Sequence, residues 1–221
     1  MGELITLTAA DGHNRPAWPS GQEGPGLVVI QEIFGLNNHI RHTADRFAAE
    51  GFSVMAPALF HRVAPGVELG YTEADVKRGR EIRAKVALED ALRDIAAAVD
   101  ALTSEGLRVG VVGYCWGGSL AWAAATRLEG IRAAVSYYGG EVAKMADEKP
   151  RCPVMLHFGE QDHAIPMSDV ATVRQKHPEL PVYTYPAGHG FSCDERGSFH
   201  PESHAIALSR TLPFLRKHLG G

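Results

Sequence analysis

Residues 107–125 read LRVGVVGYCWGGSLAWAAA: an apolar run, a turn of small residues around Cys115, and a helix-forming stretch. Gly113 and Gly117 stand two residues before and after Cys115, which gives the pattern G-x-C-x-G. Between a strand and a helix, this pattern is typical of a nucleophile elbow, a strained turn that projects one side chain above the edge of a sheet. Glycine at the flanking positions removes Cβ atoms that would collide there. The stretch predicts Cys115 as a nucleophile, with a buried structural cysteine as the alternative.

Short apolar runs alternate with helical patterns along most of the chain. Strands are expected at about 5–9, 27–31, 52–56, 107–112, 133–137, 154–158 and 182–185, and helices at about 37–50, 72–103 with Gly79 as a candidate break, 119–125, 168–176 and 202–217. Strands that alternate with helices imply an α/β fold with a mostly parallel central sheet and helices on both faces. Functional sites in such folds form at the carboxyl ends of the strands.

Composition narrows the class of protein. The chain has 221 residues, 45% of them hydrophobic, and a formal net charge of −4, which predicts one domain over residues 1–221 and no nucleic acid or anionic membrane as partner. The sequence begins without a secretory pattern and contains no apolar run long enough to span a bilayer. Three cysteines without a disulfide spacing suit a reducing compartment. We expect a cytoplasmic monomer or small homo-oligomer that needs no cofactor.

Two later loops carry the side chains that would complete a catalytic triad. Asp162 lies in the loop after the strand at 154–158, and His189 lies between two glycines after the strand at 182–185. His189 would take the proton of the Cys115 thiol, and Asp162 would orient the imidazole and stabilise its charged form. Asp162 has the alternative role of a helix cap, with Glu160 as a competing carboxylate, and His189 has that of a turn residue.

Five motifs in this order resemble the dienelactone hydrolase family of α/β-hydrolases. They are Gln31–Gly35, Gly113–Gly118, Tyr137–Gly139, Gly159–His163 and Gly188–Phe191. The resemblance runs from about residue 27 to residue 215, nearly the whole chain. It implies the α/β-hydrolase fold, a Cys-Asp-His triad in that chain order, and the hydrolysis of a small lactone or ester without a metal ion.

Further site residues follow from the resemblance. In the family, the glutamate that matches Glu32 contacts the resting thiol and helps to convert it to thiolate once substrate is bound. From the sequence alone, Glu32 is an acid at the end of a buried strand, where a helix cap or an ion pair is the alternative role. The backbone N–H of Trp116, directly after the nucleophile, should form the oxyanion hole, and the resemblance adds that of Ile33.

The sequence departs from the family where members that act on dienelactones hold the substrate carboxylate with two arginines. Arg78, Arg80 and Arg83 lie in the first region, where they are interpreted as a solvated helix face, and the first arginine after His189 is Arg196. These departures predict a neutral lactone or ester as the preferred substrate, unless Arg78, Arg80 or Arg196 compensates. The aromatic side chains expected either in an apolar pocket or in the core are Phe34, Trp116, Tyr137 and Tyr138.

Two other classes of function stay open at this point. His189, Cys193, His200 and His204 are separated by three, six and three intervening residues, which invites a zinc site. Glycines between them and the proline after His200 oppose a helix that carries paired ligands. The second alternative is a member of the fold that has lost catalysis and binds a small molecule, against which the intact set of nucleophile, base and acid argues.

Overall fold

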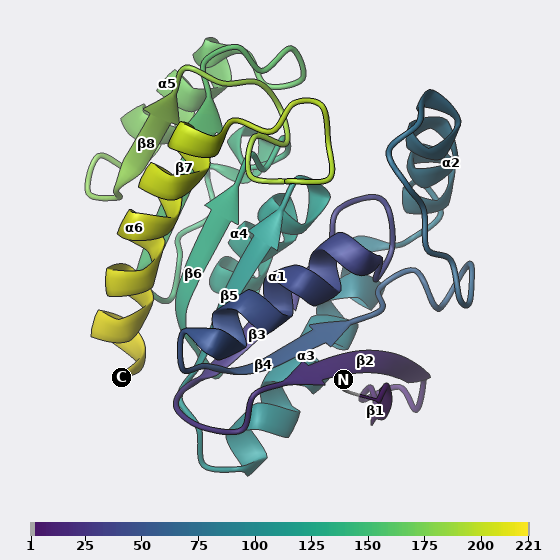
Figure 1. Cartoon of the computed structure of the whole chain (residues 1–221). Helices are drawn as coiled ribbons and strands as arrows, with labels where there is room; N and C mark the ends of the chain where they lie inside the picture. The colour runs from purple at the N-terminus through teal and green to yellow at the C-terminus, as the bar shows by residue number, and fades with distance from the viewer. Residues whose placement is uncertain (1–2, 221) are drawn as a thin grey trace.

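The computed structural model describes residues 3–220, and a twisted sheet of eight strands forms its centre (Figure 1). The order across the sheet is β1-β2-β4-β3-β5-β6-β7-β8, and only the pairs β1–β2 and β2–β4 are antiparallel. The strands are β1 (Ile5–Thr8), β2 (Asn14–Ser20), β3 (Gly26–Ile30), β4 (Ser53–Pro57), β5 (Val109–Tyr114), β6 (Ile131–Tyr137), β7 (Val154–Gly159) and β8 (Val182–Tyr185). The predicted α/β-hydrolase fold with a mostly parallel sheet is confirmed.

Helices cover both faces of the sheet. They are α1 (Asn38–Ala49), α2 (Glu73–Arg83), α3 (Leu88–Ser104), α4 (Trp116–Arg127), α5 (Met167–Lys176) and α6 (Pro201–Leu219), with a 3₁₀ turn at Ala143–Met145. Helices α1 and α6 lie on one face, whereas α3 and α4 lie on the other (Figure 1). The central strands are buried along their whole length, as parallel strands between two helical layers must be. No helix within residues 3–220 combines the length and the apolar composition that crossing a bilayer requires.

Two elements differ from the expectation. Strand β2 was not predicted, because Pro16 and Pro19 interrupt its sequence and proline is normally kept out of strands. The expected helix at 72–103 is two helices, but the break falls at residues 84–87 rather than at Gly79. Gly79 lies inside α2 and has a packing role. A Cβ atom there would come within 2.2 Å of the carbonyl oxygen of Ile33, so only glycine lets α2 approach the loop after β3 this closely.

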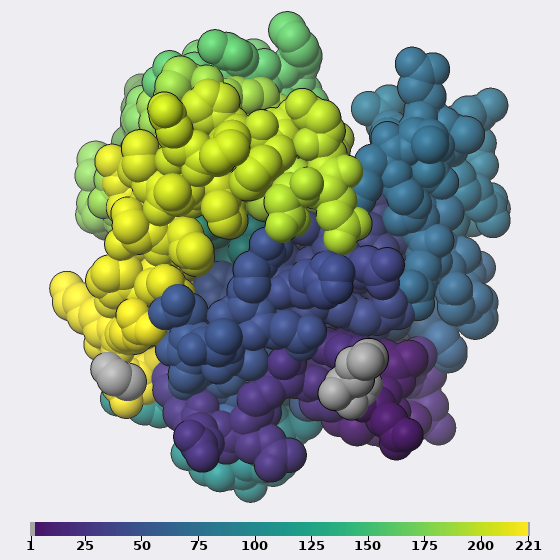
Figure 2. All heavy atoms as spheres, in the orientation of Figure 1, coloured from purple at the N-terminus to yellow at the C-terminus, as the bar shows by residue number. Residues whose placement is uncertain are grey.

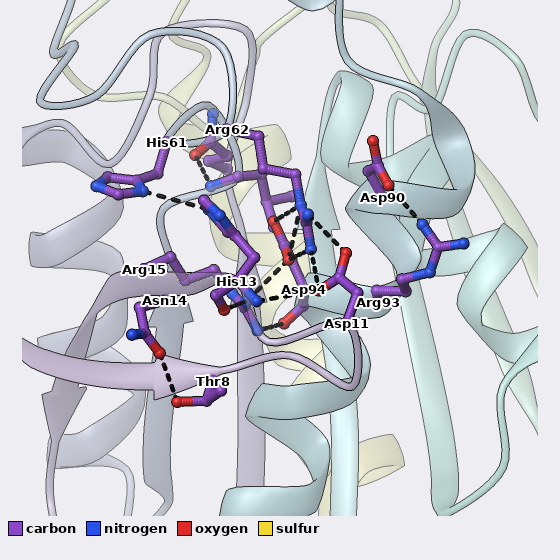
Figure 3. Close-up of polar contacts among 12 residues, drawn as sticks. Thr8, Asp11, His13, Asn14, Arg15, His61, Arg62, Asp90, Arg93 and Asp94 are labelled. Atoms are coloured by element: carbon purple, nitrogen blue, oxygen red, sulfur yellow. Dashed lines mark hydrogen bonds and ion pairs between the residues drawn. The ribbon is translucent and has the colours of Figure 1, made fainter.

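A buried ion network ties the first hairpin to α3 (Figure 3). Arg15 of β2 and Asp94 of α3 are both fully buried, and their Nη1 and Oδ1 atoms lie 2.8 Å apart. Arg62 bridges Asp94 at 2.7 Å and Asp11 at 2.8 Å, which satisfies the remaining charge. Removing one partner of such a network leaves an uncompensated buried charge, so the intact network holds β2 in place against α3.

Candidate active site

The elbow at Cys115 has the strained geometry that the sequence predicts. Cys115 joins β5 to α4 with φ 56° and ψ −118°, a conformation that side chains other than glycine rarely adopt. A Cβ atom on Gly113 would lie 1.9 Å from the carbonyl oxygen of Gly117, and one on Gly117 would lie 2.4 Å from that of Ile30. Both glycines are therefore required by contact with backbone that cannot move aside.

Three predicted residues form one hydrogen-bonded chain. Sγ of Cys115 lies 3.1 Å from Nε2 of His189, and Nδ1 of His189 lies 2.7 Å from Oδ2 of Asp162. The side chain of Asp162 is fully buried, and its other oxygen accepts the N–H of Ala164 at 2.8 Å. Asp162 does not cap α5, whose N-cap is Pro166, and the competing Glu160 is exposed. This is the geometry of a nucleophile, a base and an orienting acid.

The surroundings of His189 favour its protonated form. Burial by itself would lower the pKa of His189, but the charge interaction with Cys115 and the hydrogen bond to Asp162 outweigh it and raise the pKa to about 10. The ring of Tyr138 packs edge-on against His189 with centroids 5.1 Å apart, which restricts rotation of the imidazole. An imidazolium held beside sulfur stabilises a thiolate–imidazolium ion pair.

The two residues predicted to supply oxyanion donors, Ile33 and Trp116, line the same pocket as Cys115. Trp116 is the first residue of α4, so its N–H has no acceptor within the helix and the positive end of the helix dipole faces Cys115. The arrangement suits the stabilisation of a developing oxyanion.

A pocket of about 470 Å³ opens above the sulfur between α2 and the loop that carries His189 and Arg196. Figure 2 shows α2 standing apart from the C-terminal loop, with a furrow between them. The lining residues are Ile33, Phe34, Val76, Arg80, Arg83, Cys115, Trp116, Ser119, Gly140, Glu141, Lys144, Ala164, His189 and Arg196. Tyr137 and Tyr138 are not among them: both are buried, in agreement with the alternative that they are core residues.

The positive charge of this pocket differs from the expectation. Arg78 is exposed beside Glu81, as a solvated helix face predicts, but Arg80 and Arg83 line the pocket. Arg80 is exposed and Arg83 is half-buried, so these two residues belong to a solvated helix face that also borders the pocket. Arg196, the first arginine after His189, also lines the pocket.

Glu32 is not among the residues that line the pocket, and it has partners that the sequence did not indicate. It is 1% exposed, and its carboxylate contacts the hydroxyl of Tyr71 at 3.3 Å and Nη1 of Arg196 at 3.4 Å. The thiol of Cys115 is directed to His189 instead. The guanidinium of Arg196 lies 5.5 Å from the ring centre of Phe34 and packs against Gly190, where a Cβ would approach it to 2.6 Å.

The four residues of the alternative zinc site do not form one group of potential ligands within residues 3–220. Within residues 3–220, the group of potential metal ligands that lies close together is Glu32, His39 and Cys193, and it shares only Cys193 with the set proposed from spacing. His189 is engaged by Asp162 and Cys115. No signal in the linear sequence connects His39 with Cys193, because they are 154 residues apart.

Comparison with known proteins agrees with this architecture. The model of the dienelactone hydrolase family matches residues 13–219. A Synechocystis sp. protein assigned as a carboxymethylenebutenolidase is 33% identical over 88% of this chain and 87% of its own, and carboxymethylenebutenolidase 1 of Cupriavidus pinatubonensis is 31% identical over 97% of each. The crystal structure of a Klebsiella pneumoniae protein assigned as a dienelactone hydrolase superposes with a TM-score of 0.82 at 30% identity, covering 96% of this chain and 98% of the other. The chain belongs to the dienelactone hydrolase family.

Proposed function

We propose that this protein is a cysteine-dependent hydrolase of small lactones or esters, with Cys115 as nucleophile, His189 as general base and acid, and Asp162 as the orienting acid. That it is a hydrolase of ester or lactone bonds follows from its family. The observation that supports the finer assignment is the continuous chain of contacts, 3.1 Å from sulfur to imidazole and 2.7 Å from imidazole to carboxylate, below an open pocket.

The proposed reaction has two steps. The thiolate of Cys115 attacks the substrate carbonyl, and the N–H groups of Ile33 and Trp116 stabilise the oxyanion. The C–O bond to the alcohol breaks, and His189 donates its proton to the leaving oxygen. A water molecule then loses a proton to His189 and attacks the thioester, which releases the acid and restores the thiolate.

We further propose Glu32 as a gate for the thiol. Its carboxylate is buried, and its two contacts at 3.3 and 3.4 Å are long for hydrogen bonds of an ionised group. A carboxylate next to sulfur opposes thiolate formation, whereas imidazolium favours it. Rotation of the thiol between Glu32 and His189 would therefore switch the nucleophile between a quiet and a reactive state.

The charge of the pocket favours an anionic substrate over the neutral one expected from the sequence. Apart from the pair of Cys115 and His189, four of the lining side chains are cationic, namely Arg80, Arg83, Lys144 and Arg196, against the single carboxylate of Glu141. Glu141 pairs with Arg83, whereas Arg80 has no ion-pair partner among residues 3–220. We propose that Arg80 and Arg196 hold a carboxylate on the substrate, since arginine binds carboxylates by paired hydrogen bonds.

A hydrolysis screen tests the proposed function. Carboxylated lactones, neutral lactones and aryl esters are assayed with the wild-type protein and with Cys115→Ala. Turnover of at least one lactone or ester by the wild type alone supports the proposal. A protein that binds these compounds tightly and hydrolyses none of them would instead be a binding member of the fold.

Replacing Glu32 tests the gate. We expect Glu32→Gln to lower kcat about tenfold or more with little change in KM, because the amide keeps the volume but carries no charge. Alkylation rates of Cys115 measured from pH 5 to 10 should show thiolate at lower pH in the variant, since a nearby negative charge has been removed. An unchanged rate together with an unchanged thiol titration would leave Glu32 a structural acid.

Replacing Arg80 tests the substrate charge. We expect the wild type to prefer a carboxylated lactone over its methyl ester by a hundredfold or more in kcat/KM, which corresponds to about 2.7 kcal/mol. Arg80→Gln should reduce this preference about tenfold or more, because one of the two cationic contacts is lost. Arg78→Gln is the matched control, since Arg78 lies on the same helix outside the pocket. Equal use of acid and ester by the wild type would contradict the anionic assignment.

A further inference from the structure

A second group of reactive side chains is buried outside the lining of the pocket. Glu32 follows β3, His39 is in the first turn of α1, and Cys193 lies in the loop between β8 and α6. One potential ligand atom from each side chain lies within 4.8 Å of the others, and all three residues are buried. Three segments distant in sequence thus direct a carboxylate, an imidazole and a thiol to one interior point.

His39 is oriented as a metal-binding histidine is. Its Nδ1 lies 3.2 Å from Oδ1 of Asp194, a contact that places the proton on Nδ1 and leaves a lone pair on Nε2. His39 is 1% exposed, and among residues 3–220 its Nε2 has no hydrogen-bond partner. Metal-binding histidines donate their other N–H to a carboxylate in this way. An unpartnered buried nitrogen is costly unless something binds to it.

The other two side chains are also available. Glu32 has only the long contacts to Tyr71 and Arg196 described above. Cys193 is fully buried and forms no disulfide. The hydroxyl of Tyr71 lies beside both Glu32 and Cys193. A carboxylate, an imidazole and a thiol are the three side-chain types that Zn²⁺ prefers.

We propose that Glu32, His39 and Cys193 form a binding site for a thiophilic divalent cation, with Zn²⁺ as the best match. Zinc ligands lie about 2.0 to 2.3 Å from the metal, so rotations of the Cys193 and Glu32 side chains must shorten the distances between them. Binding replaces the S–H bond of Cys193 with an S–Zn bond and releases that proton to solvent. The fourth position of a tetrahedral site is left to water.

Occupancy of this site would inhibit the enzyme, a consequence that rests on the proposed function. The cation would take the carboxylate of Glu32 from Arg196, and Arg196 also lines the pocket. Metal binding would therefore alter both the proposed thiol gate, Glu32, and one of the two proposed carboxylate-binding residues, Arg196. A chelator should reverse the effect, because no covalent bond to carbon forms or breaks.

Cobalt binding to a catalytically silent protein tests the site independently of catalysis. Cys115→Ala removes the competing thiol of the active site, and Co²⁺ serves as a spectroscopic substitute for zinc. We expect one equivalent of Co²⁺ with a thiolate-to-cobalt absorption band, displaced by Zn²⁺. The band should be lost in Cys115→Ala/Cys193→Ser and kept in Cys115→Ala/Cys152→Ser, which removes a thiol outside the cluster. No band in Cys115→Ala, or a band that survives Cys193→Ser, would overturn the proposal.

A variant of the supporting carboxylate gives a second measurement that spares the buried core. The side chain of Asp194 is 40% exposed, so Asp194→Asn in the Cys115→Ala protein should fold normally. Without its partner carboxylate, His39 should bind the metal about 10- to 100-fold more weakly. An unchanged cobalt affinity would exclude His39 as an oriented ligand. If the proposed hydrolysis fails but this binding series succeeds, the metal site stands alone.

Discussion

Cys115→Ala should lower kcat/KM for the best lactone or ester by about 10⁴-fold or more, the largest effect expected of any single substitution in this chain. The variant keeps the oxyanion donors and the pocket but has no atom that can form the thioester, so only the contribution of binding and electrostatics remains. Steady-state hydrolysis measures the loss, with Cys152→Ala as the control for removal of a thiol elsewhere. Full activity in Cys115→Ala would end the assignment of the nucleophile.

Two further measurements on the same variant separate chemistry from folding. A thiol alkylator should label Cys115 before Cys152 or Cys193, because burial raises the pKa of those two thiols to about 11 and about 12. In Cys115→Ala, the pKa of His189 should fall from about 10 toward its ordinary 6.5, since the thiolate charge is gone. The raised pKa stabilises the folded protein below about pH 6.5 and this stabilisation is lost as the pH rises through 10. The alanine variant should lose part of that dependence.

Asp162→Asn should lower kcat by about 10³- to 10⁴-fold, the second largest expected effect. The amide has nearly the same volume, but it offers Nδ1 of His189 either a neutral acceptor or a donor, so the imidazole is held in the wrong tautomer or loses its charged partner. The exposed neighbour Glu160 provides the matched control, and Glu160→Gln should leave kcat unchanged. Hydrolysis assays of both variants make the comparison.

If Asp162 is not the orienting acid, the results expected for the Asp162 and Glu160 variants are reversed. A large loss in Glu160→Gln with full activity in Asp162→Asn would transfer the role of the acid to Glu160. Circular dichroism of Asp162→Asn should match the wild type, because among residues 3–220 the hydrogen-bond partners of the Asp162 side chain are His189 and the loop N–H of Ala164. A folded but slow variant would therefore report on orientation of the imidazole.

The parts of the fold that follow local rules could be predicted from the sequence. The strands in the interior of the sheet show as apolar runs, and Gly113 is required by close contact with Gly117, only four residues further along the chain. Strand β2 could not be recognised, because its two prolines fit only next to β1 and β4 in antiparallel pairing. The role of Gly79 also depends on a distant partner, the carbonyl of Ile33.

The same distinction applies to the site. Cys115, Asp162 and His189 could be proposed from the sequence because each follows a strand, and the topology brings strand ends together. The contacts of Glu32 with Tyr71 and Arg196 could not be predicted, because those two side chains come from irregular segments whose path the sequence pattern does not specify. The direction of Arg80 into the pocket depends on how α2 is rotated about its axis, and its short apolar stripe leaves that rotation open.

Helix α2 forms a wall of the pocket that substitutions can change, and with it the range of substrates, while the rest of the fold is kept. It carries Val76, Arg80 and Arg83 of the pocket wall, yet no strand or other helix in residues 3–220 packs extensively against it (Figure 1). An element with so few neighbours opens by local unfolding at low free energy, and its amides should exchange with solvent sooner than those of β5. Mutation can therefore remodel this wall while the sheet folds as before. Gly79 limits such changes, because any larger residue at this position would push α2 away from Ile33.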